Sequence, residues 1–328
     1  MQLRIVLNAA LAAVTLSGAT PAYAQSTWKP EKSVEIVVPA AAAGGTDRTA
    51  RVIQRIFQNT KALPVPAVVN NRPGGGGSIG WTYVAQRAGD PHYLAMTQPA
   101  LLTNFITAAS KLDPRILTPL AQLSNEYIGF SVRADSSIRT AADLVQRLVK
   151  DPQGVVFGVS NALGAPGHIA LALVARAINA DIRKLKVVVF ASGGESQSAL
   201  LGGHIEVVPS TVANLVAPMQ SGRVRVVAVT APRRLTGAFA HVPTWREQGA
   251  DAVVGNWRGM AGPPKMERTQ VAYWEAALLR MTQSEDWLGD LEKDSAQADF
   301  MSSVESGKFI AAQLDELRKI LVDLELAK

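Results

Sequence analysis

The sequence predicts an α/β protein with mostly parallel sheets flanked by helices, because short apolar strands alternate with helices along most of the chain. Residues 34–39 hold four Val or Ile in six positions, which is typical of a buried strand. A loop of small residues, 40–45, follows this strand, and apolar residues then recur at helical spacing between residues 50 and 57. Thr46 is a good helix N-cap, and Asp47 suits the positive end of the helix dipole.

The same strand–loop–helix unit occurs twice more. Residues 155–160 predict a Val-rich strand, and residues 161–165 form a loop of small and polar residues. Pro166 then suits the first turn of a helix. In the third unit, a strand over 186–190 is followed by a loop of small residues over 191–194.

Further elements complete the expected fold. The third unit ends with a short helix over 195–201, which Gly202-Gly203 should terminate. Two more strands are expected over 205–208 and 224–230, with residues 209–211 as the loop after the first. The last 70 residues have apolar residues at helical spacing, and they predict packing helices over 269–281 and 309–326.

The loops that leave the strands predict a ligand cleft. In parallel sheets, the loops at the carboxyl ends of the strands line the ligand crevice. Here several such loops are short and almost uncharged, and they offer backbone N–H groups at helix starts, which is an anion-binding arrangement. Small residues there could also serve packing alone. The expected ligand contacts are Ala43, Gly44, Gly45, Thr46, Asp47, Ser160, Asn161, Ala165, Pro166, Gly167, His168, Ser192, Gly193, Ser210 and Thr211.

Four of these residues have two interpretations each. Asp47 either contacts the ligand or stabilises the helix dipole by about 0.3–1 kcal/mol. His168 either forms a hydrogen bond with the ligand or has a structural role, and Thr46 and Ser160 either touch the ligand or a bridging water or cap their helices. Because loops 40–46, 160–167 and 191–194 contain no basic residue, we expect backbone and hydroxyl donors, rather than a buried Arg or Lys, to neutralise the anion.

The first 24 residues predict a cleaved secretory signal peptide. Arg4 is their only charge, an apolar stretch of about a dozen residues follows it, and Ala22-Tyr23-Ala24 is an A-x-A cleavage site. A membrane anchor is the alternative, but a spanning helix needs about 20 apolar residues. The chain has no cysteine, so it has neither a lipid attachment site nor a disulfide. We therefore expect a periplasmic protein of two domains, with about 304 of the 328 residues remaining.

Other functions find little support in the sequence. The formal net charge is +6, but the basic residues are scattered and Arg233-Arg234 is among the longest basic runs, so we expect no nucleic-acid partner. The four histidines are dispersed without metal-ligand spacing, and neither a metal nor a cofactor is expected. Residues 74–80 match both the dinucleotide pattern and G-x-S-x-G, but Asn70 to Pro73 separates them from the strand before. A serine hydrolase that uses Ser78 is kept as an alternative.

Several segments, in order and at matching spacing, resemble the periplasmic receptors of tripartite tricarboxylate transporters, the Bug family. The resemblance runs from about residue 32 to residue 264, and more weakly to the C-terminus. The matching segments are Val38-Pro39, Gly44 to Asp47 with Ala50-Arg51, Asn71 to Gly74 with Gly80, Leu200 to Gly203, Val227 to Thr230, Val242 to Thr244 and Asn256 to Pro263.

This resemblance implies a two-lobed periplasmic-binding-protein fold of the Venus-flytrap type II class, with the ligand between the lobes. We expect residues 27–126 and 231–328 to form lobe one and residues 127–230 to form lobe two. The implied function is capture of a di- or tricarboxylate or an aromatic acid by a monomeric, non-enzymatic receptor, for delivery to multi-span membrane subunits. An orphan ligand sensor is a further alternative. Departures from the family pattern at Ala40, Ala43, residues 190–192 and residues 209–211 predict an atypical pocket wall.

Overall fold

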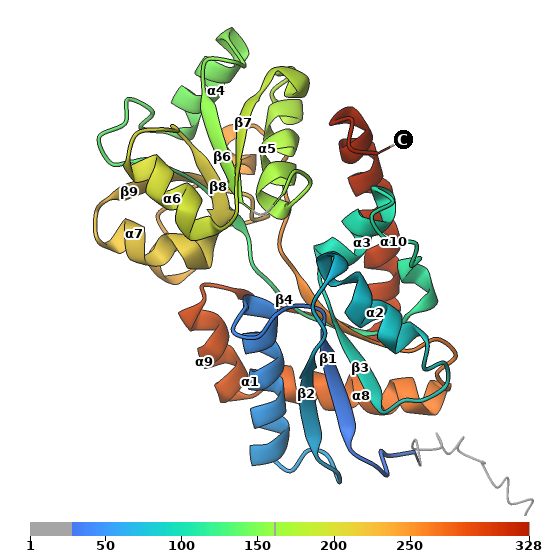
Figure 1. The fold of residues 1–328 in the computed structure, drawn as a ribbon. Helices are drawn as coiled ribbons and strands as arrows, with labels where there is room; N and C mark the ends of the chain where they lie inside the picture. The colour runs from blue at the N-terminus through green and yellow to red at the C-terminus, as the bar shows by residue number, and fades with distance from the viewer. Residues whose placement is uncertain (1–27, 161, 328) are drawn as a thin grey trace, which may run out of the picture.

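The computed structural model describes residues 28–160 and 162–327, and these residues form two lobes joined by extended segments (Figure 1). The expected signal peptide lies outside the described residues. Within the described ranges, no helix is both long and apolar enough to cross a membrane. The two-lobed α/β architecture expected from the sequence is confirmed, whereas the sheets are mixed rather than mostly parallel.

Lobe one is built on a six-stranded sheet with the order β11-β4-β10-β3-β1-β2. Its strands are β1 (Val34–Val38), β2 (Ala67–Asn71), β3 (Tyr93–Thr97), β4 (Thr118–Asn125), β10 (Arg258–Gly262) and β11 (Gln297–Met301). β1 pairs in parallel with both β2 and β3. β10 is antiparallel to β3 and β4, because it returns from the second lobe. This returning strand is one reason why the sheet is mixed.

Helices cover both faces of this sheet. They are α1 (Gly45–Asn59), α2 (Ser78–Ala85), α3 (Pro99–Ile106), α8 (Arg268–Thr282), α9 (Glu285–Lys293) and α10 (Ser303–Asp323). α1, α8 and α9 share a core with Ile36 of β1, and α2, α3 and α10 share another with Val37. The side chains of β1 therefore alternate between two layers, which explains why four of its five residues are apolar; the exception, Glu35, is half-buried and accepts from Asn70 and Tyr83.

Lobe two contains the strands β5 (Ile128–Arg133), β6 (Val156–Ser160), β7 (Lys186–Phe190), β8 (Val208–Thr211) and β9 (Val224–Val229). Its helices are α4 (Ala141–Lys150), α5 (Pro166–Ala177), α6 (Gly193–Leu201) and α7 (Val216–Gln220). β5 enters from lobe one and is antiparallel to β8 and β9, while β6 and β7 are parallel. A bridge between Phe157 and Val207 links the two groups of strands.

The strand expected over 205–208 is shifted toward the C-terminus, so that it begins at residue 208. The structure forms β8 over Val208–Thr211, so the expected loop of residues 209–211 is a strand paired with β5. Proline usually argues against a strand because it cannot donate a ladder hydrogen bond. Pro209 is tolerated here because β8 is an edge of its three-stranded sheet.

The chain passes between the lobes at two neighbouring places. One is Glu126, between β4 and β5, and the other is Gly255 and Asn256, just before β10. The Asn256 amide donates to the Glu126 carbonyl at 2.7 Å, so the two segments run side by side. A Cβ on Gly255 would lie 1.9 Å from Asn125 Oδ1, so a larger residue there would require the Asn125 side chain to move. Between β9 and this crossing, the chain packs on lobe two through residues such as Phe239.

Candidate functional site

Two cavities of about 390 Å³ and 290 Å³ lie between the lobes, and both are lined by Asn256 and Arg258. The larger is lined by Gly76, Gln98, Pro99, Ala100, Thr103, Asn104, Thr107, Ala162, Leu163, Gly164, Ala165, Pro166, Asn256 and Arg258. The smaller is lined by Gly45, Arg48, Thr49, Ser124, Glu126, Thr211, Ala213, Asn214, Asn256, Arg258, Trp287, Asp290, Leu291, Asp294 and Ala296. Since both lobes contribute to each cavity, Arg258 stands at the centre of the cleft.

The guanidinium of Arg258 is held along one edge and open along the other. Its Nη1 donates to Asn256 Oδ1 at 2.8 Å, to the Asn256 carbonyl at 3.2 Å and to the Trp257 carbonyl at 3.1 Å. Nη2 faces the start of α1, where a Cβ on Gly45 would lie 3.6 Å from it. Nη2 has no hydrogen bond to any residue in the described ranges. The side chain is therefore positioned to offer a fixed donor to an anion beside the N-terminus of α1.

Glu126 lines the smaller cavity together with Arg258, and the charges of the two side chains attract each other. Burial raises the pKa of the Glu126 carboxyl, although Arg258 opposes the shift. Burial likewise lowers the pKa of Arg258, and Glu126 opposes that shift in turn. Both side chains lie deep in the cleft, yet each keeps some contact with solvent through the smaller cavity. Glu126 also accepts a hydrogen bond from the Ala213 amide at 3.3 Å, which ties the crossing segment to lobe two.

In lobe one, Asp47 holds the loop between β1 and α1. One carboxylate oxygen accepts from the Ala43 amide at 2.8 Å and from Arg51 Nε at 2.9 Å. The other oxygen accepts from Asn71 Nδ2 at 2.9 Å. Burial by the loop would raise the pKa of Asp47, but the three donors outweigh it and the net pKa is lowered. All of these contacts are internal, so they favour the structural interpretation of Asp47.

Thr46 connects the same loop to the larger cavity. Its hydroxyl donates to Gln98 Oε1 at 2.6 Å, and Gln98 lines that cavity just before α3. Thr46 itself is buried and lines neither cavity. It therefore orients a cavity residue, and its own backbone N–H lies in the first turn of α1.

In lobe two, His168 holds the loop that precedes α5. Its Nδ1 accepts a hydrogen bond from the Gly164 amide at 2.9 Å, and its side chain is buried. Burial lowers the pKa of His168 to about 4, so the imidazole is neutral at pH 7. Next to it, a Cβ on Gly167 would lie 2.5 Å from the Pro209 carbonyl oxygen, so glycine is needed there for packing. Both residues thus shape the loop from which Ala165 and Pro166 line the larger cavity.

A group of hydroxyls lies at the other loops of lobe two. Ser160 Oγ is 3.0 Å from Ser196 Oγ, and Ser192 caps α6 by accepting from the Glu195 amide. Asn214, which lines the smaller cavity, donates to Ser210 Oγ at 3.3 Å and to Thr211 Oγ1 at 3.1 Å. A Cβ on Gly193 would lie 3.1 Å from Asn214 Nδ2, so the loop before α6 lies close to this amide.

The expected site residues fall into three groups. Those that line a cavity are Gly45, Ala165, Pro166 and Thr211. Those that lie in the same loops or at their supporting strands, without lining either cavity, are Ala43, Gly44, Thr46, Asp47, Ser160, Gly167, His168, Ser192, Gly193 and Ser210. Asn161 lies outside the described residues.

Sequence reasoning missed several cavity residues: Gln98, Glu126, Asn214, Asn256 and Arg258. The segment from Asn256 to Gly259 was part of the family resemblance, and that was the one signal that could have identified Arg258. Its neighbours in the cleft come from segments far away in the chain, so no local pattern predicts its position.

The surroundings of Ser78 do not resemble a nucleophile site. Ser78 begins α2 after a turn of glycines, Gly75–Gly77, rather than directly after a strand. Its Oγ lies 3.4 Å from Asn104 Nδ2, and no histidine in the described ranges hydrogen-bonds it. A Cβ on Gly80 would lie 2.9 Å from Pro39 Cα, so this glycine serves close packing on the end of β1. A search of the described residues also finds no cluster of metal-ligating side chains.

Two α/β lobes that enclose a polar cleft, joined by paired crossing segments, define a solute-binding protein. The particular family follows from comparison. The family described as tripartite tricarboxylate transporter family receptor matches residues 49–326, and the chain belongs to this family.

Relatives agree with this assignment. A UPF0065 protein from the gbd 5′ region of Cupriavidus necator is 27% identical, with 99% of this chain and 97% of that protein covered. A TctC solute-binding protein from Polaromonas superposes with a TM-score of 0.78 at 26% identity, covering 90% and 99% of the two chains. MatC from Rhodopseudomonas palustris, solved with bound malate, has the same fold with a TM-score of 0.71 at 24% identity, covering 89% and 99%.

Proposed function

We propose that this protein is a periplasmic receptor that captures a small carboxylate between its lobes and delivers it to membrane subunits of a tripartite tricarboxylate transporter. One observation carries the proposal: Arg258 stands where two interlobe cavities meet, with the outer edge of its guanidinium open. Arginine binds carboxylates through paired N–H donors, and a buried one is more effective than an exposed one. From the sequence we expected donors of the loops, and not a buried arginine such as Arg258, to neutralise the anion. The proposal departs from that expectation because Arg258, on β10, lines both cavities.

The mechanism is closure of the lobes around the ligand. We place the hinge at Glu126 and at Gly255-Asn256, where the two crossing segments are hydrogen-bonded to each other. A ligand that touches Arg258 on one side and the loop before α5 on the other makes its full contacts only when the lobes are closed. Its binding therefore shifts the population toward the closed state.

Relatives support a carboxylate as the ligand class. MatC was solved with malate, and another Rhodopseudomonas palustris protein of this fold was solved with adipate. The donors at the two cavities are amides, hydroxyls and one central guanidinium, which suit a carboxylate with further polar groups. We infer a binding role rather than a catalytic one, because the matched family is one of transport receptors.

The localisation follows from the same proposal. The predicted signal peptide over residues 1–24 would export the chain, and a structural relative is described as a periplasmic binding protein. We infer membrane transporter subunits as partners from the name of the family.

The test is a thermal-shift screen of the mature protein against a carboxylate panel, followed by calorimetry with each ligand that stabilises it. A ligand at 100 times its Kd should add about 2.7 kcal/mol to the free energy of unfolding. Arg258→Gln should then weaken binding by about 30-fold or more, since truncating one partner of a buried charged contact costs about 2–5 kcal/mol. The matched control is Arg280→Gln, which removes the same charge from an exposed position on α8.

The proposal would be wrong if no carboxylate raised the melting temperature. The placement of the ligand would be wrong if a carboxylate bound Arg258→Gln and Arg280→Gln with equal affinity. Folding of both variants is checked by far-UV circular dichroism before any titration.

A further inference from the structure

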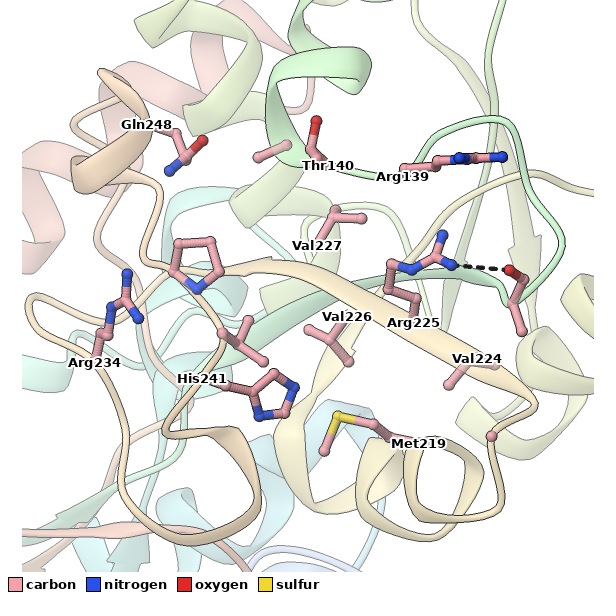
Figure 2. A pocket seen from close by; sticks show the side chains of 15 residues that line it. Arg139, Thr140, Met219, Val224, Arg225, Val226, Val227, Arg234, His241 and Gln248 are labelled. Carbon is pink, nitrogen blue, oxygen red and sulfur yellow. Dashed lines mark hydrogen bonds between the residues drawn. The ribbon is translucent and has the colours of Figure 1, made fainter.

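Lobe two has a pocket of about 650 Å³ between the start of α4, strand β9 and the segment that carries Arg234 and His241 (Figure 2). It shares no lining residue with the two cavities of the cleft. Its unpartnered donor, Arg225 Nη1, and its valines, Val226 and Val242, are buried and out of reach of a bound molecule. The two cleft cavities are therefore the better guide to the chemistry of a ligand.

The two cleft cavities differ in charge. Five charged side chains line the smaller one, and three of them are acidic: Glu126, Asp290, Asp294, Arg48 and Arg258. Among the described residues that line the larger cavity, Arg258 alone is charged. A ligand that starts at Arg258 and extends into the larger cavity therefore has a cation at one end and neutral groups along the rest of its length.

Arg258 and the start of α1 together form a place for one carboxylate. The N-cap of α1 is Gly44, and no side chain caps the helix. Gly45, the first helical residue, lines the smaller cavity, and a Cβ on it would lie 3.6 Å from Arg258 Nη2. An open guanidinium nitrogen and an uncapped helix N-terminus thus converge, and both favour an anion.

The facing loop, before α5, offers a second carboxylate few donors. The amides of Ala162, Gly164 and Ala165 already donate to acceptors inside lobe two, at 2.9–3.2 Å. Pro166, the first residue of α5, has no N–H, and neither has Pro99, the first residue of α3. A carboxylate at this end of the larger cavity would lose hydrogen bonds to water without replacing all of them, which is costly for a charged group.

The walls of the larger cavity suit a neutral body instead. Leu163 is 47% exposed at this cavity, and the half-buried Pro166 lies beside it in the lining. On the opposite wall, Gln98 Oε1 accepts from the Thr46 hydroxyl at 2.6 Å, and Gln98 Nε2 has no hydrogen-bond partner among the described residues. The cavity can therefore take an apolar body and one neutral acceptor, such as a hydroxyl or carbonyl oxygen.

The smaller cavity is also unfavourable for a second carboxylate. Burial raises the pKa of Glu126 and of Asp290, and the negative charge of Asp294 adds to both shifts. Arg48, the other cation there, already lies 3.9 Å from Asp294. Because these carboxylates repel one another, a further negative charge among them would be repelled as well.

We propose that this protein selects a ligand with one carboxylate and an otherwise neutral body. The carboxylate contacts Arg258 Nη2 and the first turn of α1, and the body extends into the larger cavity beside Leu163 and Pro166. The inference rests on the proposed function, because it describes the ligand of the same cleft. It differs from the ligands of the two relatives, malate and adipate, which have two carboxylates each.

The test is a series of four ligands with the same six-carbon chain: hexanoate, 6-hydroxyhexanoate, adipate and 6-aminohexanoate. Their far ends are a methyl group, a hydroxyl, a carboxylate and an ammonium group. Each is titrated into the full-length mature protein by calorimetry. The tighter of the two ligands with a neutral end should bind at least tenfold more tightly than adipate, because a charged group that loses a hydrogen bond loses about 10- to 150-fold in affinity.

A substitution in the larger cavity should change this preference. Leu163→Lys keeps an aliphatic stem and adds a cation at an exposed position, so it should raise the affinity for adipate about threefold and change that for 6-hydroxyhexanoate less. Leu288→Lys is the matched control, because Leu288 on α9 is also 47% exposed and lines neither cavity. It should leave the ratio of the two affinities unchanged. The series on the parent is decisive by itself if a variant does not fold.

Two results would overturn the inference while leaving the proposed function in place. One is adipate binding at least as tightly as both ligands with a neutral end. The other is 6-aminohexanoate binding most tightly, which would assign the acids of the smaller cavity to an ammonium group. If none of the four binds, the tightest ligand of the carboxylate panel decides: a single carboxylate with no other charge supports the inference, and any further charge overturns it. If no carboxylate binds at all, the proposed function fails and this inference fails with it.

Discussion

The loop before α1 in lobe one and the loop before α5 in lobe two are held in the same way by different chemical groups. In each, the third residue of the helix accepts a hydrogen bond from the backbone amide four residues earlier. Asp47 accepts from Ala43 at 2.8 Å, and His168 accepts from Gly164 at 2.9 Å. Both loops border the interlobe cleft, so both lobes fix their side of the site by one side chain at a helix start.

The Asp47 carboxylate and the His168 imidazole differ in how many hydrogen bonds they can accept and in how they respond to pH. The Asp47 carboxylate accepts from three donors and has a lowered pKa, so it is charged at neutral pH. Neutral imidazole has one acceptor nitrogen, and protonation removes it. The pKa of His168, about 4, places that loss in the acid range. The loop of lobe one is therefore held by more hydrogen bonds, whereas the hydrogen bond that holds the loop of lobe two is lost when His168 is protonated.

The largest expected effect is on lobe one. Asp47→Ala removes the acceptor of the Ala43 amide, of Asn71 and of Arg51 together. Asp47 is buried, but Ala43 and Arg51 are exposed and can bond water once it is lost, so the cost comes from the hydrogen bonds to the carboxylate and from the half-buried Asn71. We expect the free energy of unfolding to fall by about 3–4 kcal/mol. Urea denaturation measures it. Glu292→Ala, at an exposed carboxylate on α9, is the control and should stay within about 0.5 kcal/mol.

Asp47→Asn separates the two interpretations of this residue. If it abolishes carboxylate binding without lowering the melting temperature, Asp47 contacts the ligand and the comparison between the loops fails. A folded variant with lower stability and a moderate loss of affinity supports the structural interpretation.

In lobe two, His168 should make the stability of the protein depend on pH. A histidine whose pKa is lowered by folding leaves more protons on the unfolded chain between its two pKa values, so stability must fall as the pH falls. For His168 the window runs from about 6.5 down to about 4. The loss across it should be roughly 3 kcal/mol, since each unit of pKa difference corresponds to about 1.4 kcal/mol. Urea titrations at successive pH values measure this dependence.

The control for this prediction is His168→Gln, which keeps an acceptor for the Gly164 amide but does not titrate. Its stability should change less between pH 6.5 and pH 4 than that of the parent. A parent and variant with the same pH profile would show that His168 does not report on this loop.

These two loops also show how far the sequence determines the structure. The strand and the small-residue loop before Asp47 are local features, so Val/Ile content and small residues predicted them. The expected N-cap at Thr46 was wrong: α1 begins at Gly45 with Gly44 as its N-cap, and the Thr46 hydroxyl bonds Gln98 instead.

The structural alternative for His168 was also visible, because its place in the first helical turn is local. The strand expected over 205–208 was misplaced, and the strand that forms includes Pro209, which is tolerated only because β8 is a sheet edge, a property of topology.

The position of Arg258 also could not be predicted from local sequence, because it too depends on the tertiary fold. Its partners in the cleft are Gly45 of α1 and Glu126 of the crossing segment, which only the tertiary fold brings to β10. The sequence therefore predicted loops that border the two cavities, and not the arginine that lines both.

Smaller effects should distinguish the hydroxyls on the two sides of the cleft. Thr46→Ala removes the donor to Gln98, a cavity residue, and we expect a loss of about 1 kcal/mol in ligand affinity, or roughly fivefold. Ser160→Ala should cost less, about twofold, because Ser196 keeps its bond to the Gly193 carbonyl. Calorimetry with the identified carboxylate compares them. The reverse order, or parent affinity in both, would remove these hydroxyls from the site.

The smallest expected effect tests why the hydrogen bonds of Asp47 stabilise the protein. The reason is either the position of the carboxylate in the first helical turn or its burial. Glu195 repeats the arrangement at the start of α6, where its carboxylate accepts from the Ala191 amide at 2.9 Å. Unlike Asp47 and His168, it is exposed, so water can replace the lost bond. Glu195→Gln should change the free energy of unfolding by less than about 0.5 kcal/mol, measured by urea denaturation beside Asp47→Asn. A loss as large as that of Asp47→Asn would mean that the position in the first helical turn, and not burial with several donors, gives the carboxylate of lobe one its strength.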